Sequence, residues 1–184
     1  VLNCMQRMSG IATKTSEYAK AIEGTKAKVI DTRKTTPNLR FLEKYAVTVG
    51  GGFNHRFGLY DMIMLKDNHI DFCGGITKAV HKVHEYLKVN NLNLRIEVET
   101  RSLENVKEVL LCGGVNRIML DNFVPEKVKE AVDLINGKYE TEASGGITLE
   151  TIRSFAETGV DFISVGALTH SVKSLDLSLK AEIN

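Results

Sequence analysis

The chain has 184 residues, with 24 Lys and Arg against 23 Asp and Glu, and 43% of its residues are hydrophobic. This balance excludes an intrinsically disordered chain, and a net charge of +1 argues against a module that binds nucleic acid through a basic field. No apolar run approaches the ~20 residues of a membrane span. The length suits one domain, so we expect residues 1–184 to form a single domain with neither nucleic acid nor a membrane as its partner.

The segment that begins the chain has the periodicity of a helix. Its apolar residues recur at steps of three, four and seven, at Leu2, Met5, Met8, Ile11, Tyr18 and Ile22. Residue 1 is valine, and no Ser, Thr, Asp or Asn stands before the helix as an N-cap. We therefore expect that chain upstream of Val1 is missing, either a whole domain or a few terminal residues.

Strand and helix patterns then alternate about six times. We expect strands at 27–31, 61–65, 95–100, 117–121, 139–143 and 161–165, and helices at 38–49, 76–89, 102–111, 125–135 and 148–158. Most of these strands are short and apolar, as is typical of a parallel sheet covered by helices. The pattern fits a doubly wound sheet or a barrel, and a complete eightfold barrel needs ~250 residues. A barrel here would therefore be a shortened (β/α) barrel of six or seven mostly parallel strands.

The end of the chain and its scattered Cys and His residues allow fewer conclusions. Leucines alternate with polar residues at Leu175, Leu177 and Leu179, which predicts a final strand or an edge that pairs with upstream chain. The three cysteines lack CxxC spacing, which argues against a disulfide framework or a zinc site and favours a reducing compartment, the cytoplasm. No base is evident beside them, which argues against a catalytic thiol. His81 and His84 share a helix face with charged neighbours and are interpreted as solvated. His69 either caps the segment after it or lines a site.

Polar residues gather where the expected strands end. The strand ends carry Arg33, Lys34, Lys66, Glu99, Asp121, Ser144-Gly145-Gly146 and Gly166, and the loop before the second strand adds His55 and Arg56. In parallel α/β folds these ends meet at one face, which holds the site. Clustered cations suit a substrate with several negative charges. A glycine turn that opens a helix can bind a phosphate, and carboxylates suit ribose hydroxyls or Mg²⁺. The sequence thus predicts a pocket for a polyanionic substrate and a phosphorylated sugar.

Several strings resemble the quinolinate phosphoribosyltransferase family, also called nicotinate-nucleotide pyrophosphorylase (carboxylating). The strings are LNCMQRMSGIAT (2–13), DTRKTTPNLR (31–40), EKYAVTVGGGFNHRFGLYDMIMLKDNHI (43–70), EVET (97–100), MLDNF (119–123), EASGGIT (142–148) and ISVGALTH (163–170). The resemblance covers essentially the whole chain. It implies a shortened α/β barrel that follows an N-terminal α/β sandwich domain, and we expect that domain to be missing from this chain. It also implies a homodimer or higher assembly, in which an arginine from the neighbouring subunit's N-terminal domain completes the active site.

The resemblance implies a reaction as well. Phosphoribosyl passes from phosphoribosyl pyrophosphate to the ring nitrogen of quinolinate, pyrophosphate and CO2 leave, and nicotinate mononucleotide forms on the route to NAD, with Mg²⁺ accompanying the pyrophosphate. Arg33, His55, Arg56 and Lys66 match the binders of the dicarboxylate. Lys34 matches a residue that contacts the sugar-pyrophosphate, and Glu99 and Asp121 match the acidic pair near the ribose and metal. Thr32 is expected to be a further substrate-binding residue. Ser144-Gly145-Gly146, Ser164-Val165-Gly166 and His170 match the 5′-phosphate loops. Lys66, Glu99 and Asp121 are the expected catalytic residues.

Two other interpretations compete with the enzyme. The first is a paralogous pyrophosphorylase-like protein associated with molybdenum transport, which would be expected to lose parts of the quinolinate cluster, although the cluster is whole here. The second is a non-catalytic barrel that binds a phosphorylated metabolite. A catalyst should bind both quinolinate and phosphoribosyl pyrophosphate, whereas a phosphate sensor should bind only the second.

Overall fold

Strands and helices alternate along residues 1–182, which are the residues that the computed structural model describes. The strands are β1 (Lys28–Ile30), β2 (Ile63–Leu65), β3 (Ile96–Thr100), β4 (Arg117–Asp121), β5 (Glu140–Ser144) and β6 (Phe162–Ser164). The longer helices are α1 (Leu2–Ala21), α2 (Arg40–Val49), α4 (Ile76–Val89), α5 (Leu103–Cys112) and α6 (Pro125–Ile135), and the shorter ones are α3 (Asp67–Cys73), α7 (Ile152–Ala156) and α8 (Ala167–His170). No helix in this range has the length and apolar character to cross a bilayer.

The six strands form one parallel sheet in the order β1-β6-β5-β4-β3-β2. The order follows the chain without reversal, and β1 lies beside β6, as in a barrel; a doubly wound sheet would reverse its order at a switch point. Beside β1, an isolated parallel bridge joins Ile30 to Phe53 in the segment before β2. This arrangement confirms the shortened barrel and excludes the doubly wound alternative.

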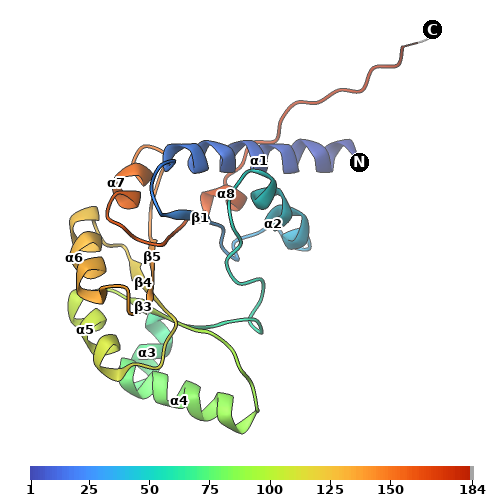
Figure 1. The fold of residues 1–184 in the computed structure, drawn as a ribbon. Helices are drawn as coiled ribbons and strands as arrows, with labels where there is room; N and C mark the ends of the chain where they lie inside the picture. Colours follow the sequence, from blue (N-terminus) through green and yellow to red (C-terminus); the bar gives the residue numbers. More distant parts are fainter. Residues whose placement is uncertain (183–184) are drawn as a thin grey trace.

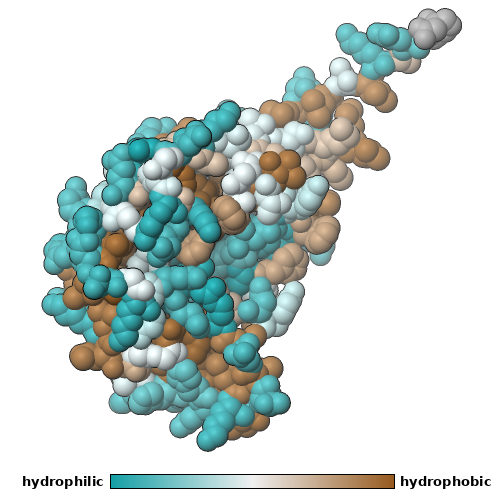
Figure 2. Space-filling model, in the orientation of Figure 1, coloured by the Kyte–Doolittle hydropathy of each residue, from teal (hydrophilic) through white to brown (hydrophobic). Residues whose placement is uncertain are grey.

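Helices cover the outside of the curved sheet. In Figure 1, α7, α6, α5 and α4 follow one another along its outer side, and α1 lies across the end near α7 and α8. Outward-facing residues of the strands, such as Val98, Ile118, Leu120 and Ile163, are 0% exposed and form the core with these helices. Hydrophilic residues cover much of the outer surface over α6 and α7 (Figure 2). The core therefore lies between the sheet and the helices, as burial of one sheet face requires.

The inward face of the central strands is polar, which differs from the expectation of apolar strands. Side chains alternate across a strand, so the partners of the apolar core positions point into the barrel. These inward residues are Glu97, Glu99, Arg117, Met119, Asp121, Glu140, Glu142 and Ser144. The interior is therefore built from charged groups of both signs that pair with one another.

Two short helices and the end of the chain depart from the predictions. Helix α3 was not predicted; His69 stabilises its start, because its Nδ1 accepts the Lys66 N–H at 3.0 Å. Helix α8 was also not predicted. The tail expected to form a final strand contains none through residue 182; instead, the Leu175 N–H donates to the Gln6 carbonyl at 3.0 Å. Beyond this contact with α1, the tail extends away from the barrel (Figure 1). The prediction of a final strand is therefore wrong.

Candidate active site

The carboxyl ends of the strands surround a cavity of about 870 Å³. Every site residue predicted from the sequence lines it: Thr32, Arg33, Lys34, His55, Arg56, Lys66, Glu99, Asp121, Ser144, Gly145, Gly146, Ser164, Val165, Gly166 and His170. The volume suits a ligand of ordinary metabolite size. The cationic side chains from the first half of the chain and the glycine turns from the second half thus line the same cavity. The predicted site requires this convergence.

Two guanidinium groups form the cationic side of the cavity. Burial, and after it the nearby charge of Arg33, lowers the pKa of Arg56. The Arg56 Nη1 donates to the Met62 carbonyl at 3.0 Å, which holds one side of the guanidinium in place. The Arg33 Nε is buried and has no hydrogen-bond partner among residues 1–182. An anion that reached both groups would relieve their repulsion and accept the free N–H, so this pair is suited to a carboxylate.

The loop that carries Arg33 and Lys34 is held by three helices. Glu43 of α2, which is 0% exposed, accepts the Arg7 Nε at 2.9 Å and the Thr36 N–H at 3.0 Å. Arg7 of α1 also donates to the Thr169 carbonyl at 2.9 Å, and the Thr169 hydroxyl of α8 donates to the Lys34 carbonyl at 2.7 Å. This network fixes the backbone of the loop and leaves its cationic side chains to the cavity.

A buried ion pair fixes His55 at the base of the cavity. Asp31, 0% exposed, pairs with Lys44, which is 1% exposed. Asp31 accepts the His55 N–H at 2.9 Å, and the Lys44 Nζ donates to the His55 carbonyl at 3.0 Å. Burial raises the pKa of Asp31 and lowers that of Lys44, and their mutual attraction opposes both shifts. The pair therefore connects the end of β1 to the segment that carries His55 and Arg56.

Two carboxylates face the cavity from the ends of adjacent strands. Burial, and then the charge of Asp121, raises the pKa of Glu99. The Lys66 Nζ lies 3.9 Å from Glu99, and the Asn122 amide donates to Asp121 at 2.6 Å. Paired oxygen ligands whose charges repel one another would gain from a divalent cation, and Mg²⁺ prefers such ligands. These residues fit a magnesium ion bound together with a phosphorylated substrate.

The glycine turn after β5 has a backbone that only glycine adopts readily. Gly145 has φ +101° and Gly146 φ +60°. A Cβ on Gly145 would lie 2.3 Å from the Asn122 Oδ1, so a side chain cannot fit there. The expectation that this turn opens a helix over 148–158 is wrong, because α7 spans only Ile152–Ala156. The Thr148 N–H donates to the Thr151 hydroxyl at 3.0 Å, and this separate turn lies between the glycines and α7.

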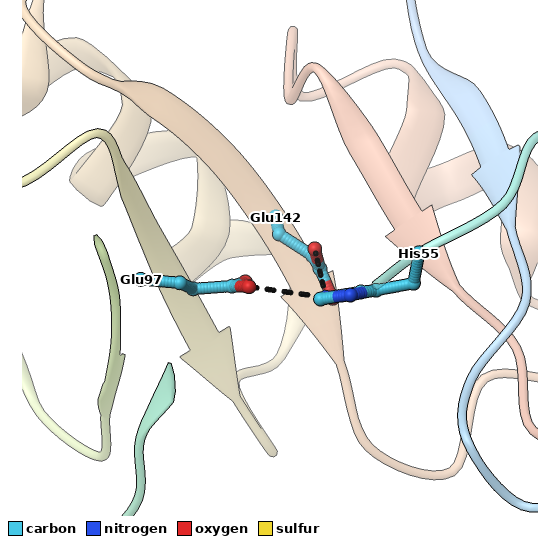
Figure 3. A group of neighbouring side chains, drawn as sticks. All are labelled: His55, Glu97 and Glu142. Carbon is cyan, nitrogen blue, oxygen red and sulfur yellow. Dashed lines mark ion pairs between the residues drawn. The ribbon is translucent and has the colours of Figure 1, made fainter. Parts of the chain in front are cut away.

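Sequence reasoning missed a charged cluster inside the barrel. His55 points between Glu97 of β3 and Glu142 of β5 (Figure 3), with its Nε2 3.0 Å from the Glu97 Oε2 and 3.3 Å from the Glu142 Oε2. The Arg117 Nη1 of β4 donates to Glu142 at 2.8 Å. Charged residues at every second position of the expected strands, as in RIEVET and ETEAS, are the pattern that could have indicated it.

The remaining His and Cys residues lie outside the cavity. His69 caps α3, which settles its ambiguous role. His84 contacts the Gly114 carbonyl at 2.8 Å. Within the described part of the chain, neither His81 nor His84 belongs to a cluster of metal-ligand residues, and no cysteine lines the cavity.

Comparisons with known proteins identify the family. The model of the family described as "Quinolinate phosphoribosyl transferase, C-terminal domain" matches residues 11–180. The chloroplastic nicotinate-nucleotide pyrophosphorylase [carboxylating] of Arabidopsis thaliana is 55% identical over 99% of this chain and 56% of its own length. The probable enzyme of the same name from Bacillus subtilis is 50% identical over 100% of this chain and 62% of its own.

Solved structures agree with these relatives. The crystal structure of NadC from Streptococcus pyogenes superimposes with a TM-score of 0.91 at 48% identity, over 98% of this chain and 62% of that one. The chain thus spans little more than half the length of the curated relatives that it matches. With its parallel barrel and the residues at its mouth, the chain belongs to the quinolinate phosphoribosyl transferase family and corresponds to that family's C-terminal domain.

Proposed function

We propose that this chain forms the catalytic barrel of a quinolinate phosphoribosyltransferase (decarboxylating). The enzyme transfers phosphoribosyl from phosphoribosyl pyrophosphate to quinolinate and yields nicotinate mononucleotide, pyrophosphate and CO2 in NAD biosynthesis. One observation carries the proposal: a single cavity holds two neighbouring guanidinium groups, one of them with a buried N–H that lacks a partner, together with an acidic pair and two glycine turns. These groups suit, in that order, a dicarboxylate, a ribose with its metal and a phosphate.

The cationic side would bind and orient quinolinate. Arg33, Arg56 and Lys66 would hold its two carboxylates and displace their water, with His55 at the base, so that the ring nitrogen faces the anomeric carbon of the ribose. The bond from the nitrogen to that carbon forms while the bond to pyrophosphate breaks. The ring nitrogen then carries positive charge, so the 2-carboxylate can leave as CO2, and a proton takes its place on the ring.

The opposite side would bind the activated sugar. Glu99 and Asp121 would stabilise positive charge on the ribose as the leaving group departs, and Thr32 and Lys34 would contact the sugar-pyrophosphate. Bound with the pyrophosphate near Glu99 and Asp121, Mg²⁺ supplies charge neutralisation for the leaving group. The turns at 144–146 and 164–166, with His170, would hold the 5′-phosphate.

We also propose a homodimer or higher assembly and a cytoplasmic location. Large apolar side chains of α2 are exposed, with Phe41 71%, Tyr45 61% and Val49 62% exposed, which supports contact with a second copy or a further part of the protein. A location in a reducing compartment is supported by the free cysteines Cys4, Cys73 and Cys112.

The test is Arg33→Ala in the full-length protein. Loss of a charge-assisted contact in the transition state costs about 2–4 kcal/mol, so quinolinate turnover should fall ~30- to 1000-fold. Arg153→Ala on the outer surface is the matched control and should retain turnover. Near-normal turnover by Arg33→Ala would remove Arg33 from its role.

Calorimetry with each substrate tests the function as a whole. The enzyme should bind quinolinate and phosphoribosyl pyrophosphate separately. Binding of the sugar phosphate alone would overturn the enzyme and indicate a phosphate sensor instead.

A further inference from the structure

A single residue joins the acidic side of the cavity to the glycine turn. Asp121 ends β4 and Ser144 ends β5, and the two residues are partners in the parallel ladder. Asn122, which follows Asp121 and lines the cavity, donates its backbone N–H to the Ser144 carbonyl at 2.8 Å. The ladder therefore continues one residue beyond β4, up to the start of the turn that is suited to a phosphate.

The side chain of Asn122 contacts both groups. Its Nδ2 donates to the Asp121 Oδ2 at 2.6 Å, and the Asp121 carboxylate accepts no other hydrogen bond within residues 1–182. A Cβ on Gly145 would lie 2.3 Å from the Asn122 Oδ1 and 2.8 Å from its Cγ, so the amide packs directly on the bare backbone of the turn. One planar amide thus has a carboxylate at its nitrogen and the glycine turn at its oxygen.

The backbone of Asn122 offers a simpler explanation for this residue. Its φ is +58°, in the left-handed region, which Asn tolerates better than most residues. Three other Asn residues in the described part of the chain have positive φ, and they lie outside the cavity: Asn38, Asn91 and Asn136. On this explanation Asn122 only turns the chain where β4 ends. Glycine would serve that purpose equally well but cannot supply the amide, so the two explanations lead to different results.

The cationic side of the cavity is held by contacts that do not involve Asn122. The Arg56 guanidinium donates to the Met62 carbonyl at 3.0 Å. The loop that carries Arg33 is held by buried Glu43 of α2. Removal of the Asn122 amide should therefore disturb the side that is suited to a phosphorylated sugar and leave intact the side that is suited to a dicarboxylate.

We propose that Asn122 is a positioning residue that fixes the Asp121 carboxylate and the turn at 144–146 relative to one another. A phosphoribosyl group has its ribose hydroxyls and its 5′-phosphate at a separation that its own covalent structure sets. A ligand that binds both protein groups therefore gains affinity when their separation is fixed before it binds. This inference rests on the proposed function in taking a phosphoribosyl group as the ligand of these two groups.

Asn122→Gly in the full-length protein separates the amide from the turn of the chain. Glycine adopts the same left-handed backbone, so the melting temperature should change little. Affinity for phosphoribosyl pyrophosphate, measured by calorimetry, should fall on the order of tenfold, because one hydrogen bond to a charged group is lost. Quinolinate affinity should not change. Asn136→Gly replaces another left-handed Asn at the end of α6, outside the cavity, and as the matched control it should leave both affinities unchanged.

Inorganic phosphate distinguishes positioning from support of the turn alone. Phosphate is too small to contact both groups, so its affinity should fall less in Asn122→Gly than that of phosphoribosyl pyrophosphate. An equal fall for the two ligands would overturn the inference. Asn122→Asp keeps the size of the side chain and lacks the amide donor, so it should also bind phosphoribosyl pyrophosphate more weakly.

The remaining outcomes separate this inference from the proposed function. Unchanged affinity for phosphoribosyl pyrophosphate in either Asn122 variant, or an equal fall for quinolinate, would overturn the inference and leave the proposed function intact. If the unmodified protein binds phosphoribosyl pyrophosphate and not quinolinate, the proposed function fails, and the comparison of the variants still decides the role of Asn122. If the unmodified protein binds neither substrate, both fail.

Discussion

Replacement of Lys44 by methionine should be among the most destabilising single changes in the protein. It removes the cation that neutralises buried Asp31 and leaves that carboxylate 0% exposed. Asp31 can then stay charged, at a cost of about 3–5 kcal/mol, or take up a proton. For a carboxyl of ordinary pKa 3.8, protonation at pH 7 costs about 1.36 kcal/mol for each of about three units, or ~4 kcal/mol. Both routes therefore predict a loss of about 4 kcal/mol.

The same reasoning predicts how this loss depends on pH. In Lys44→Met the pKa of Asp31 is raised further in the folded state, so the folded state binds a proton that the unfolded state has released. The deficit therefore shrinks as pH falls toward the unfolded value, from about 4 kcal/mol at pH 7 to about 2 kcal/mol at pH 5. Urea unfolding at both pH values measures it.

Two further variants separate the charge from other effects of the substitution. Lys129→Met breaks an exposed pair with Asp133 on α6 and should change the free energy of unfolding by less than about 0.5 kcal/mol. Adding Asp31→Asn to Lys44→Met removes the stranded charge and keeps an oxygen for the His55 N–H, so it should recover most of the loss. A deficit below about 1 kcal/mol at pH 7, or one independent of pH, would refute this reasoning.

Three other results are expected. Gly145→Ala should lower the melting temperature more than Gly146→Ala, because a Cβ on Gly145 would lie 2.3 Å from Asn122. A Cβ on Gly146 has free space, so that variant loses only the about 1 kcal/mol that a left-handed backbone costs a non-glycine residue. Equal effects would contradict the clash. Burial, and then the charge of Glu142, raises the pKa of Glu97 from 4.5 to about 7, so the free energy of unfolding should fall as the pH rises through this range. Urea titrations of Glu97→Gln should show a shallower dependence on pH there. An unchanged dependence would exclude Glu97 as the cause. Thr169→Val removes the donor to the arginine-bearing loop and should cost about 0.5–1.5 kcal/mol with weaker sugar-phosphate binding; unchanged affinity would show that this contact does not position the loop.

The convergence of the site could be predicted from the sequence because it follows from topology. Parallel strands of a barrel bring their carboxyl ends to one face, so the residues after each apolar run had to meet once the β-α pattern was established. Arg33, Lys66, Glu99 and Asp121 were found in this way, although they lie far apart in the chain. Nothing about individual side-chain contacts was needed.

Other features depend on interactions that no local pattern carries. The short α3 begins because His69 accepts a backbone N–H three residues back, a contact that the same letters could equally make in a loop. Helix α7 begins late because Gly145 and Gly146 adopt positive φ and a second turn follows them. The tail lacks a strand because its backbone hydrogen bonds go to Gln6 of α1 and to no strand edge among the described residues.

The charged interior of the barrel explains why its mouth can bind an anion. Glu140 accepts Arg117 at 3.0 Å, and Arg117 in turn neutralises Glu142 at 2.8 Å, so these acids compensate a cation inside the barrel. If instead they were free to attract the guanidinium groups above them, Arg33 and Arg56 would be neutralised from below and would gain little from a substrate. Burial, and then the charge of Arg33, lowers the pKa of Arg56, and the charges of Glu97 and Asp61 oppose this shift only in part. We therefore expect an anion from solvent to relieve the remaining repulsion. Thus we expect the ion pairs inside the barrel to influence the affinity for an anion at the mouth without touching it.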